Sequence, residues 1–119
     1  MQDLRIDHVL ETFDGAPIKD MDEEGNSKEL TLQRVLVNAV AKPEPNLSGE
    51  EATKRFDLSM RIHKSEGTVS VSLEELGLIK KLIPKAYNAP LIIGQAYHLI
   101  DPPKLEAVPE QKSETQPEA

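Results

Sequence analysis

The stretch from Val69 to Ile83 reads VSVSLEELGLIKKLI, and its pattern changes from that of a strand to that of a helix within three residues. Val69 and Val71 alternate with serines, as in a short strand with one buried face. Ser72 and Glu75 then match a capping box, in which the serine hydroxyl accepts from the third N–H of a helix and the glutamate reaches back to the N–H of the cap. The stretch therefore predicts a strand that leads directly into a helix.

The helix that starts at Ser72 is expected to be central in the fold. Its acidic first turn and its lysines near the end complement the helix dipole, and Val71 and Leu76 can close a hydrophobic staple. Because Pro84 lacks an N–H, we expect the helix to kink or end near Ile83. Its apolar residues cover a wide arc, as in a helix packed on both flanks: Leu73, Leu76, Leu78, Ile79, Leu82 and Ile83.

Two earlier segments carry the signals of amphipathic helices. Thr31 is a cap for a helix that ends near Ala41, before a proline-rich segment. Ser48 opens a second capping box and predicts a helix from about Gly49 to Lys64. The first helix has one apolar stripe that we expect to be buried, formed by Leu32, Val35, Leu36, Ala39 and Val40. The second helix has two apolar rows that we also expect to be buried: one is Ala52, Phe56 and Met60, and the other is Leu58 and Ile62.

A last helix is predicted from Leu91 to Ile100, with Pro90 in its first turn. Its expected apolar face consists of Ile92, Ile93, Ala96, Tyr97 and Ile100.

The N-terminal part of the chain predicts a β-hairpin. Asp14-Gly15 is a typical turn pair, and it separates two short apolar segments, Val9–Phe13 and Ala16–Lys19. The following segment, residues 20–29, is polar and acidic and is expected to be a loop. We therefore predict a helix-dominated α+β domain over residues 1–100, with about four helices, the hairpin and one further short strand. Residues 101–119 are rich in proline and glutamate, which predicts a disordered acidic tail.

Composition excludes several classes of function. The chain of 119 residues is long enough for one domain, and its net charge of −7 argues against a general binder of nucleic acid or anionic membranes. The absence of cysteine excludes disulfides and thiolate metal sites. The sequence shows no signal-peptide pattern and no apolar segment of membrane-spanning length, so we expect a cytoplasmic protein with no membrane partner.

No motif for catalysis or for a cofactor is present. The chain lacks a P-loop, a Gly-x-Gly-x-x-Gly motif and a nucleophile elbow, and its three histidines are scattered, so we expect no enzyme, no cofactor and no metal. Residues 20–26 resemble the start of a calcium loop, but Thr31 stands where a bidentate glutamate is required. A solvated acidic loop is the favoured interpretation.

Four basic residues on the helix over residues 49–64 are the candidate contact residues for nucleic acid or for a partner: Lys54, Arg55, Arg61 and Lys64. The alternative is a solvated helix face on which these side chains pair with neighbouring carboxylates.

Three segments resemble small proteins encoded by tailed bacteriophages and prophages. They are Leu30–Ala39, Leu47–Phe56 and Ile79–Tyr97, and the resemblance extends over residues 13–100. It implies a phage accessory protein in the bacterial cytoplasm and carries no catalytic residue. We expect such a protein to bind a phage or host protein, either in virion assembly, where it can be virion-associated, or as an inhibitor, for example an acidic mimic of DNA. The alternative is a nucleic-acid-associated regulator, and the oligomeric state stays open.

Overall fold

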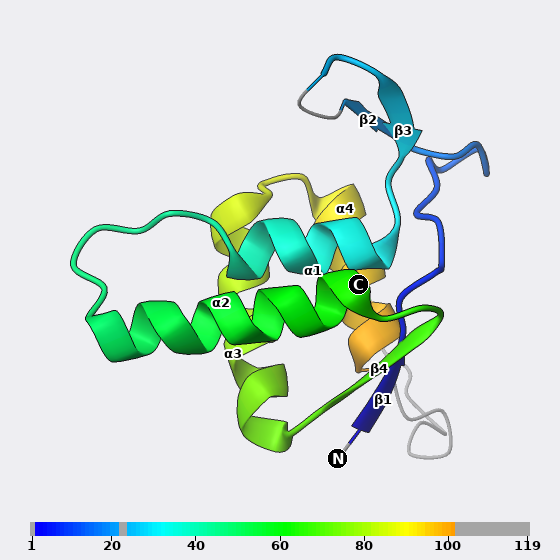
Figure 1. Ribbon diagram of the computed structural model, residues 1–119. Helices are drawn as coiled ribbons and strands as arrows, with labels where there is room; N and C mark the ends of the chain where they lie inside the picture. The colour runs from blue at the N-terminus through cyan, green and yellow to red at the C-terminus, as the bar shows by residue number, and fades with distance from the viewer. Residues whose placement is uncertain (1, 22–23, 102–119) are drawn as a thin grey trace, which may run out of the picture.

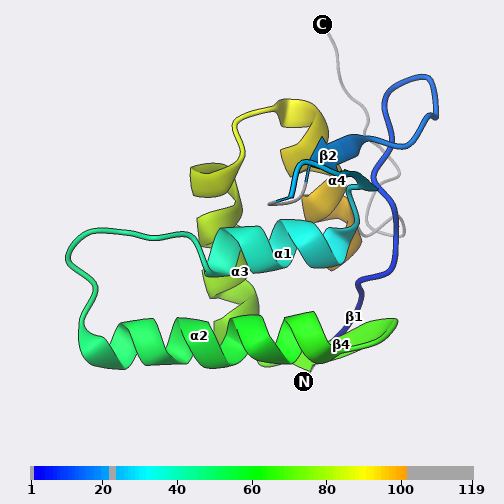
Figure 2. The same cartoon turned by 45° about the horizontal axis from the view of Figure 1, so that its top comes forward.

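Helix α1 (Leu32–Val40) lies at the centre of the fold and contacts the three other helices. It runs antiparallel to α2 (Gly49–Lys64), and α3 (Leu73–Ala86) crosses behind it (Figures 1 and 2). The computed structural model describes residues 2–21 and 24–101, so all of the predicted tail except Asp101 lies outside the described residues. The predicted helix-dominated α+β class is confirmed. The remaining elements are β1 (Gln2–Arg5), β2 (Lys19–Met21), β3 (Ser27–Glu29), β4 (Thr68–Val71) and α4 (Pro90–Ile100).

The stripe predicted for α1 is confirmed, because all five of its apolar residues are buried. The Thr31 hydroxyl accepts a hydrogen bond from the Arg34 N–H at 3.2 Å, and the helix ends at Val40 with Ala41 as its C-cap, in agreement with the predicted end near Ala41. Helix α3 packs mainly against α1 and α4, whereas α1 packs closely against both α2 and α3, so α1 takes the central position that the sequence indicated for α3. A short helix that is buried along its whole apolar stripe can contact several neighbours at once.

Helix α2 has the predicted bounds, but one of its two apolar rows is not buried. Leu58 and Ile62 are in the core, whereas Ala52 is exposed, Phe56 is 63% exposed and Met60 is only half-buried. The inward face holds Arg55 and Ser59 in their place. Because α2 packs mainly against α1, it needs only one apolar stripe, and apolar spacing alone could not tell which of the two rows this is.

The strand and helix predicted around Ser72 are confirmed. Val69 and Val71 are buried, and both halves of the capping box are present, with the Ser72 hydroxyl 3.1 Å from the Glu75 nitrogen and the Glu75 carboxylate 2.9 Å from the Ser72 nitrogen. Leu73 is the exception in the predicted apolar set, since it is 78% exposed. It is the first residue of α3, and its side chain is not packed in the core.

Helix α3 continues past Pro84 to Ala86, so of the two predicted outcomes, a kink or an end near Ile83, the end does not occur. The proline has no N–H to donate to the carbonyl of Lys80, which is four residues earlier. The Tyr97 hydroxyl of α4 donates to this carbonyl instead. Contact with α4 therefore replaces the hydrogen bond that the proline removes, and the helix can continue.

Tyr97→Phe is expected to lower the free energy of unfolding by about 1 kcal/mol, because it leaves the Lys80 carbonyl without its donor. Urea denaturation checks this. The matched test repeats the substitution in a Pro84→Ala background, where the backbone N–H of residue 84 can bond to the same carbonyl. The cost of Tyr97→Phe should then be smaller, and an equal cost in both backgrounds would contradict the interpretation.

The described strands form two antiparallel pairs that differ from the predicted hairpin. β1 pairs with β4, from Gln2 opposite Val71 to Arg5 opposite Thr68, and β2 pairs with β3. The second pair occupies the segment predicted to be a loop, with Gly25 at a φ of +86° between its strands. Every residue of β3 is exposed, so no apolar alternation reveals this hairpin.

The predicted strands over residues 9–13 and 16–19 do not form. Asp14-Gly15 does lie in a tight turn, in which the Thr12 N–H bonds to the Ala16 carbonyl at 2.8 Å, but only the isolated bridge between Glu11 and Pro17 flanks it. The Leu10 carbonyl accepts from the Ile18 N–H at 2.9 Å across this turn, whereas the Leu10 N–H bonds to the Leu30 carbonyl at 2.8 Å. The buried Leu10 is thus held by the segment that precedes α1.

Two glutamine side chains connect segments that are far apart in the sequence. The Gln33 amide of α1 donates to the carbonyls of Ile62, His63 and Ser65 at 2.9, 3.1 and 3.0 Å. It supplies a donor to carbonyls at the C-terminal end of α2, where helix geometry leaves carbonyls short of partners, and the Ile62 carbonyl also accepts from the Ser65 N–H at 3.2 Å. The Gln95 amide of α4 pairs with both the N–H and the carbonyl of Glu11, at 2.9 and 2.6 Å. The Gln33 and Gln95 side chains thus connect these segments through hydrogen bonds, which the pattern of apolar residues in the sequence does not reveal.

Candidate functional site

A cleft of about 450 Å³ lies between one flank of α2 and the N-terminal half of α3. The buried Leu58 and the half-buried Leu78 provide its large apolar side chains. Its charged lining consists of two cations, Lys54 and Arg61, and four carboxylates, Glu51, Asp57, Glu74 and Glu75. The cleft is therefore acidic, with leucines among its lining residues.

The capping box of α3 fixes one wall of this cleft. The Glu75 carboxylate accepts from the Ser72 N–H of its own cap and lies 2.5 Å from the Arg61 guanidinium of α2. Burial raises the pKa of Glu75. The hydrogen bond from the Ser72 N–H and the nearby Arg61 guanidinium lower this pKa, and together they outweigh burial, so the pKa lies below its usual value. Glu75 is therefore charged at neutral pH and joins the two helices at this wall.

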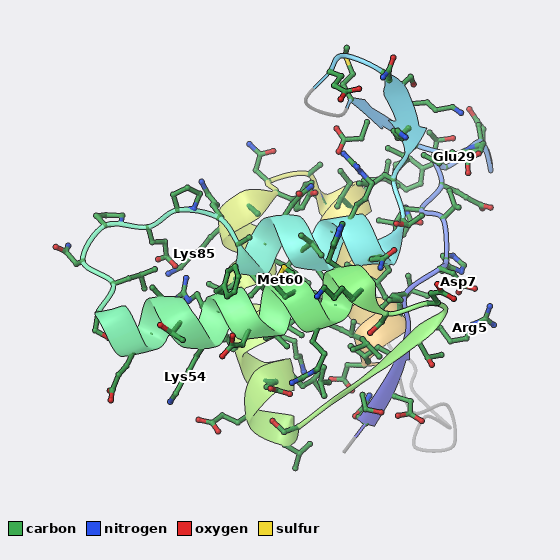
Figure 3. All side chains as sticks on the ribbon, in the orientation of Figure 1. Arg5, Asp7, Glu29, Lys54, Met60 and Lys85 are labelled. Atoms are coloured by element: carbon green, nitrogen blue, oxygen red, sulfur yellow. The ribbon has the colours of Figure 1, made fainter. Side chains whose placement is uncertain are left out.

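The other charged side chains of the cleft point to solvent. Asp57 on α2 and Glu74 on α3 are exposed, and so is Lys54, which projects from the edge of α2 in Figure 3. Leu73, which lies between the lining residues Ser72 and Glu74 in the sequence, is exposed as well. Charged and apolar groups are thus both accessible beside the cleft.

The structure brings only two of the four predicted basic contact residues together. Lys54 and Arg61 line the cleft, whereas Lys64 lies at the end of α2 and does not. Arg55 is buried on the opposite flank, where its guanidinium pairs with Glu44 and lies 3.5 Å from Glu51. The four residues therefore do not form one exposed basic face.

Glu44 links the segment between α1 and α2 to two helices. Its carboxylate pairs with the Arg55 guanidinium of α2 and lies 3.3 Å from the Lys85 ammonium of α3. Figure 3 shows Lys85 beside this connecting segment. The hydrogen bonds from Arg55 and then from Lys85 hold the pKa of Glu44 below its usual value. The ionised form of Glu44 is thus favoured by the folded state.

Glu44→Gln is expected to destabilise the fold at neutral pH and to matter less in acid. Because the folded state lowers the pKa of Glu44 from 4.5, the stabilisation is complete above that pH and is lost as the pH falls through the lower, folded value. Urea denaturation of both proteins at several pH values checks this, with Glu66→Gln on the surface as the control. A constant difference between wild type and Glu44→Gln would contradict it.

A second hollow, of about 200 Å³, lies on the other flank of α2 beside the segment between α1 and α2. Its lining is largely apolar and includes Val40, Leu47, Ala52 and Phe56. Figure 3 shows Met60 near the junction of α1 and α2. Phe56 was predicted to be in the core, but most of its side chain is accessible here.

The carboxylates of the α2/α3 cleft were missed by sequence reasoning. The sequence placed Glu75 in the capping box, which is confirmed, and Glu74 only in the acidic first turn of the same helix. The signal that was available is the short connection from Lys64 to Ser72, which must bring the start of α3 back toward α2. Capping and cleft formation thus use the same residues.

Among residues 2–21 and 24–101, no group of three histidine, aspartate or glutamate side chains could hold a metal ion. Within the same described ranges, no helix has both the length and the apolar character needed to cross a membrane. Comparison of the chain with protein-family models, curated proteins and solved structures found no match.

Proposed function

We propose that this chain is a non-enzymatic accessory protein of a tailed bacteriophage or prophage that acts by binding another protein. The observation that carries the binding role is the α2/α3 cleft, which combines accessible carboxylates with Leu58 and Leu78. Peptide segments are commonly bound in grooves that offer apolar contacts together with a few oriented polar groups. The resemblance of three sequence segments to phage proteins supports the phage context.

The partner that we propose is a phage or host protein in the bacterial cytoplasm. A role in virion assembly, as a chaperone or structural component, and a role as an inhibitor of a host protein are both served by such a cleft. The alternative, a nucleic-acid-associated regulator, gains no specific support. Arg55 is buried beside Glu44 and Glu51, and Arg61 is paired with Glu75.

A pull-down of the tagged protein from phage-infected cells tests the proposal. The lysate is washed at moderate salt and treated with nuclease, and the retained proteins are identified by mass spectrometry. We expect a specific virion or host protein that survives the nuclease. Loss of every partner after nuclease treatment would favour nucleic acid, and failure to retain any specific protein would contradict the proposal.

A further inference from the structure

We infer that the α2/α3 cleft binds a basic amphipathic helix of the partner, with an apolar side chain placed between Leu58 and Leu78 and lysine or arginine side chains facing Asp57 and Glu74. The inference rests on the proposed protein-binding function and specifies the chemistry of the partner. Three features of the cleft carry it: its size, the leucines that line it and the sign of its charge.

The size and lining of the cleft suit an apolar side chain from one face of a helix. Its volume of about 450 Å³ is within the range of ligand-binding pockets. Leu58 is buried and supplies a fixed apolar surface, Leu78 is half-buried, and Leu73 at the start of α3 is 78% exposed. A groove between two helices is a common binding site for the apolar face of a third, whose anchors recur at i and i+4.

The charges of the cleft select a basic partner. Arg61 pairs with Glu75, and the Arg55 guanidinium lies 3.5 Å from Glu51, so these two carboxylates already have cations beside them. Two exposed carboxylates remain, Asp57 and Glu74, against one exposed cation, Lys54. The whole chain carries a net charge of −7, which attracts a basic segment over a longer range.

The same charges disfavour other occupants of the cleft. Nucleic-acid phosphates would approach an acidic cleft on an acidic protein, which is electrostatically unfavourable. A second copy that presented the same cleft would place like charges opposite each other, which also opposes binding. The basic amphipathic helix is the occupant whose charge and apolar surface both complement the cleft.

A titration of the full chain with a synthetic helical peptide tests the inference. The probe carries leucines at i and i+4 spacing on one face and lysines on the other, and binding is followed by amide chemical shifts near physiological salt. We expect the largest shifts in residues 54–61 and 72–78. A peptide in which glutamine replaces the leucines should bind at least about tenfold more weakly, because the apolar contact is lost.

Charge-reversed variants separate the cleft from the general acidity of the surface. Asp57→Lys with Glu74→Lys should weaken peptide binding by about tenfold or more. Glu11→Lys with Glu66→Lys makes the same change in net charge at exposed positions outside the cleft, and should weaken it by no more than about twofold. Equal weakening by the two double variants, shifts scattered over the surface, or no binding at all would overturn the inference.

Two further measurements test whether nucleic acid or a second copy of the chain occupies the cleft: a titration with a DNA duplex and a concentration series of the protein alone. If a DNA duplex shifts the same residues, or if the cleft shifts appear on concentrating the protein alone, the cleft belongs to nucleic acid or to a second copy and the inference fails. The proposed function is tested separately by the pull-down. If the Asp57→Lys, Glu74→Lys variant still retains the partner in the pull-down, the proposed binding function remains supported, but the α2/α3 cleft is not the binding site.

Discussion

Leu82→Ala is expected to lower the free energy of unfolding by about 2–5 kcal/mol, whereas Leu73→Ala on the same helix should change it by less than about 0.5 kcal/mol. Leu82 is 1% exposed and Leu73 is 78% exposed. Truncating Leu82 removes buried methyl groups and leaves a cavity against the surrounding core. Truncating Leu73 leaves only solvent beside the first turn of α3.

This pair of variants is informative because both leucines belong to one apolar set in the sequence. Urea denaturation of the wild type and the two variants gives the differences directly, and an unchanged slope with denaturant shows that the same surface is exposed on unfolding. A loss of several kcal/mol for Leu73→Ala would mean that α3 packs on both flanks. Similar stabilities for Leu82→Ala and wild type would remove Leu82 from the core.

Gln33→Leu is expected to lower the free energy of unfolding by about 1–3 kcal/mol, because the two N–H groups of one side-chain amide are shared among three carbonyls. The amide lies within 2.9–3.1 Å of the carbonyl oxygens of Ile62, His63 and Ser65 at the end of α2. Leucine has a similar size but no donor, so the carbonyls of His63 and Ser65 lose the Gln33 amide, and the Ile62 carbonyl keeps only the Ser65 N–H. The end of α2 should also exchange its amide hydrogens faster than in the wild type.

Gln33→Glu separates the donor from the shape of the side chain. A carboxylate accepts only, so at neutral pH it would face carbonyl oxygens without any donor, and the loss should exceed that of Gln33→Leu. In acid the protonated carboxyl can donate one hydrogen bond, which should reduce the loss relative to wild type. Denaturation at neutral and acidic pH measures both effects. Stability equal to wild type at neutral pH would show that the amide does not hold α2.

The sequence was sufficient to predict the helices because capping and amphipathic spacing are local. Thr31, Ser48 and Ser72 each precede the helix that they were expected to cap. The β2–β3 hairpin was missed because β3 is polar and exposed throughout and β2 has only Met21 as an apolar residue, so neither strand carries an apolar alternation. The continuation of α3 through Pro84 was missed because it depends on the Tyr97 hydroxyl, which is brought there by packing.

The candidate site was predictable only in part. Lys54 and Arg61 were singled out as contact residues and do line the cleft, but Arg55 is one residue from Lys54 and faces the opposite flank. Its burial depends on Glu44, which comes from another segment of the chain. Apolar spacing likewise placed Phe56 inside, because its row on α2 is as regular as the one that is buried. Which flank of a helix is covered is decided by its neighbours, and these were not known.

The pairing of β1 with β4 has a consequence for the order of folding. β1 pairs with residues that follow more than 60 positions later in the chain. The α1–α2 hairpin, whose contacts are more local, can form before such a distant pair closes, because bringing remote segments together costs more chain entropy. During synthesis, β1 has to wait until β4 has left the ribosome. We therefore expect β1, although it precedes every helix in the sequence, to be one of the last elements to reach its native place.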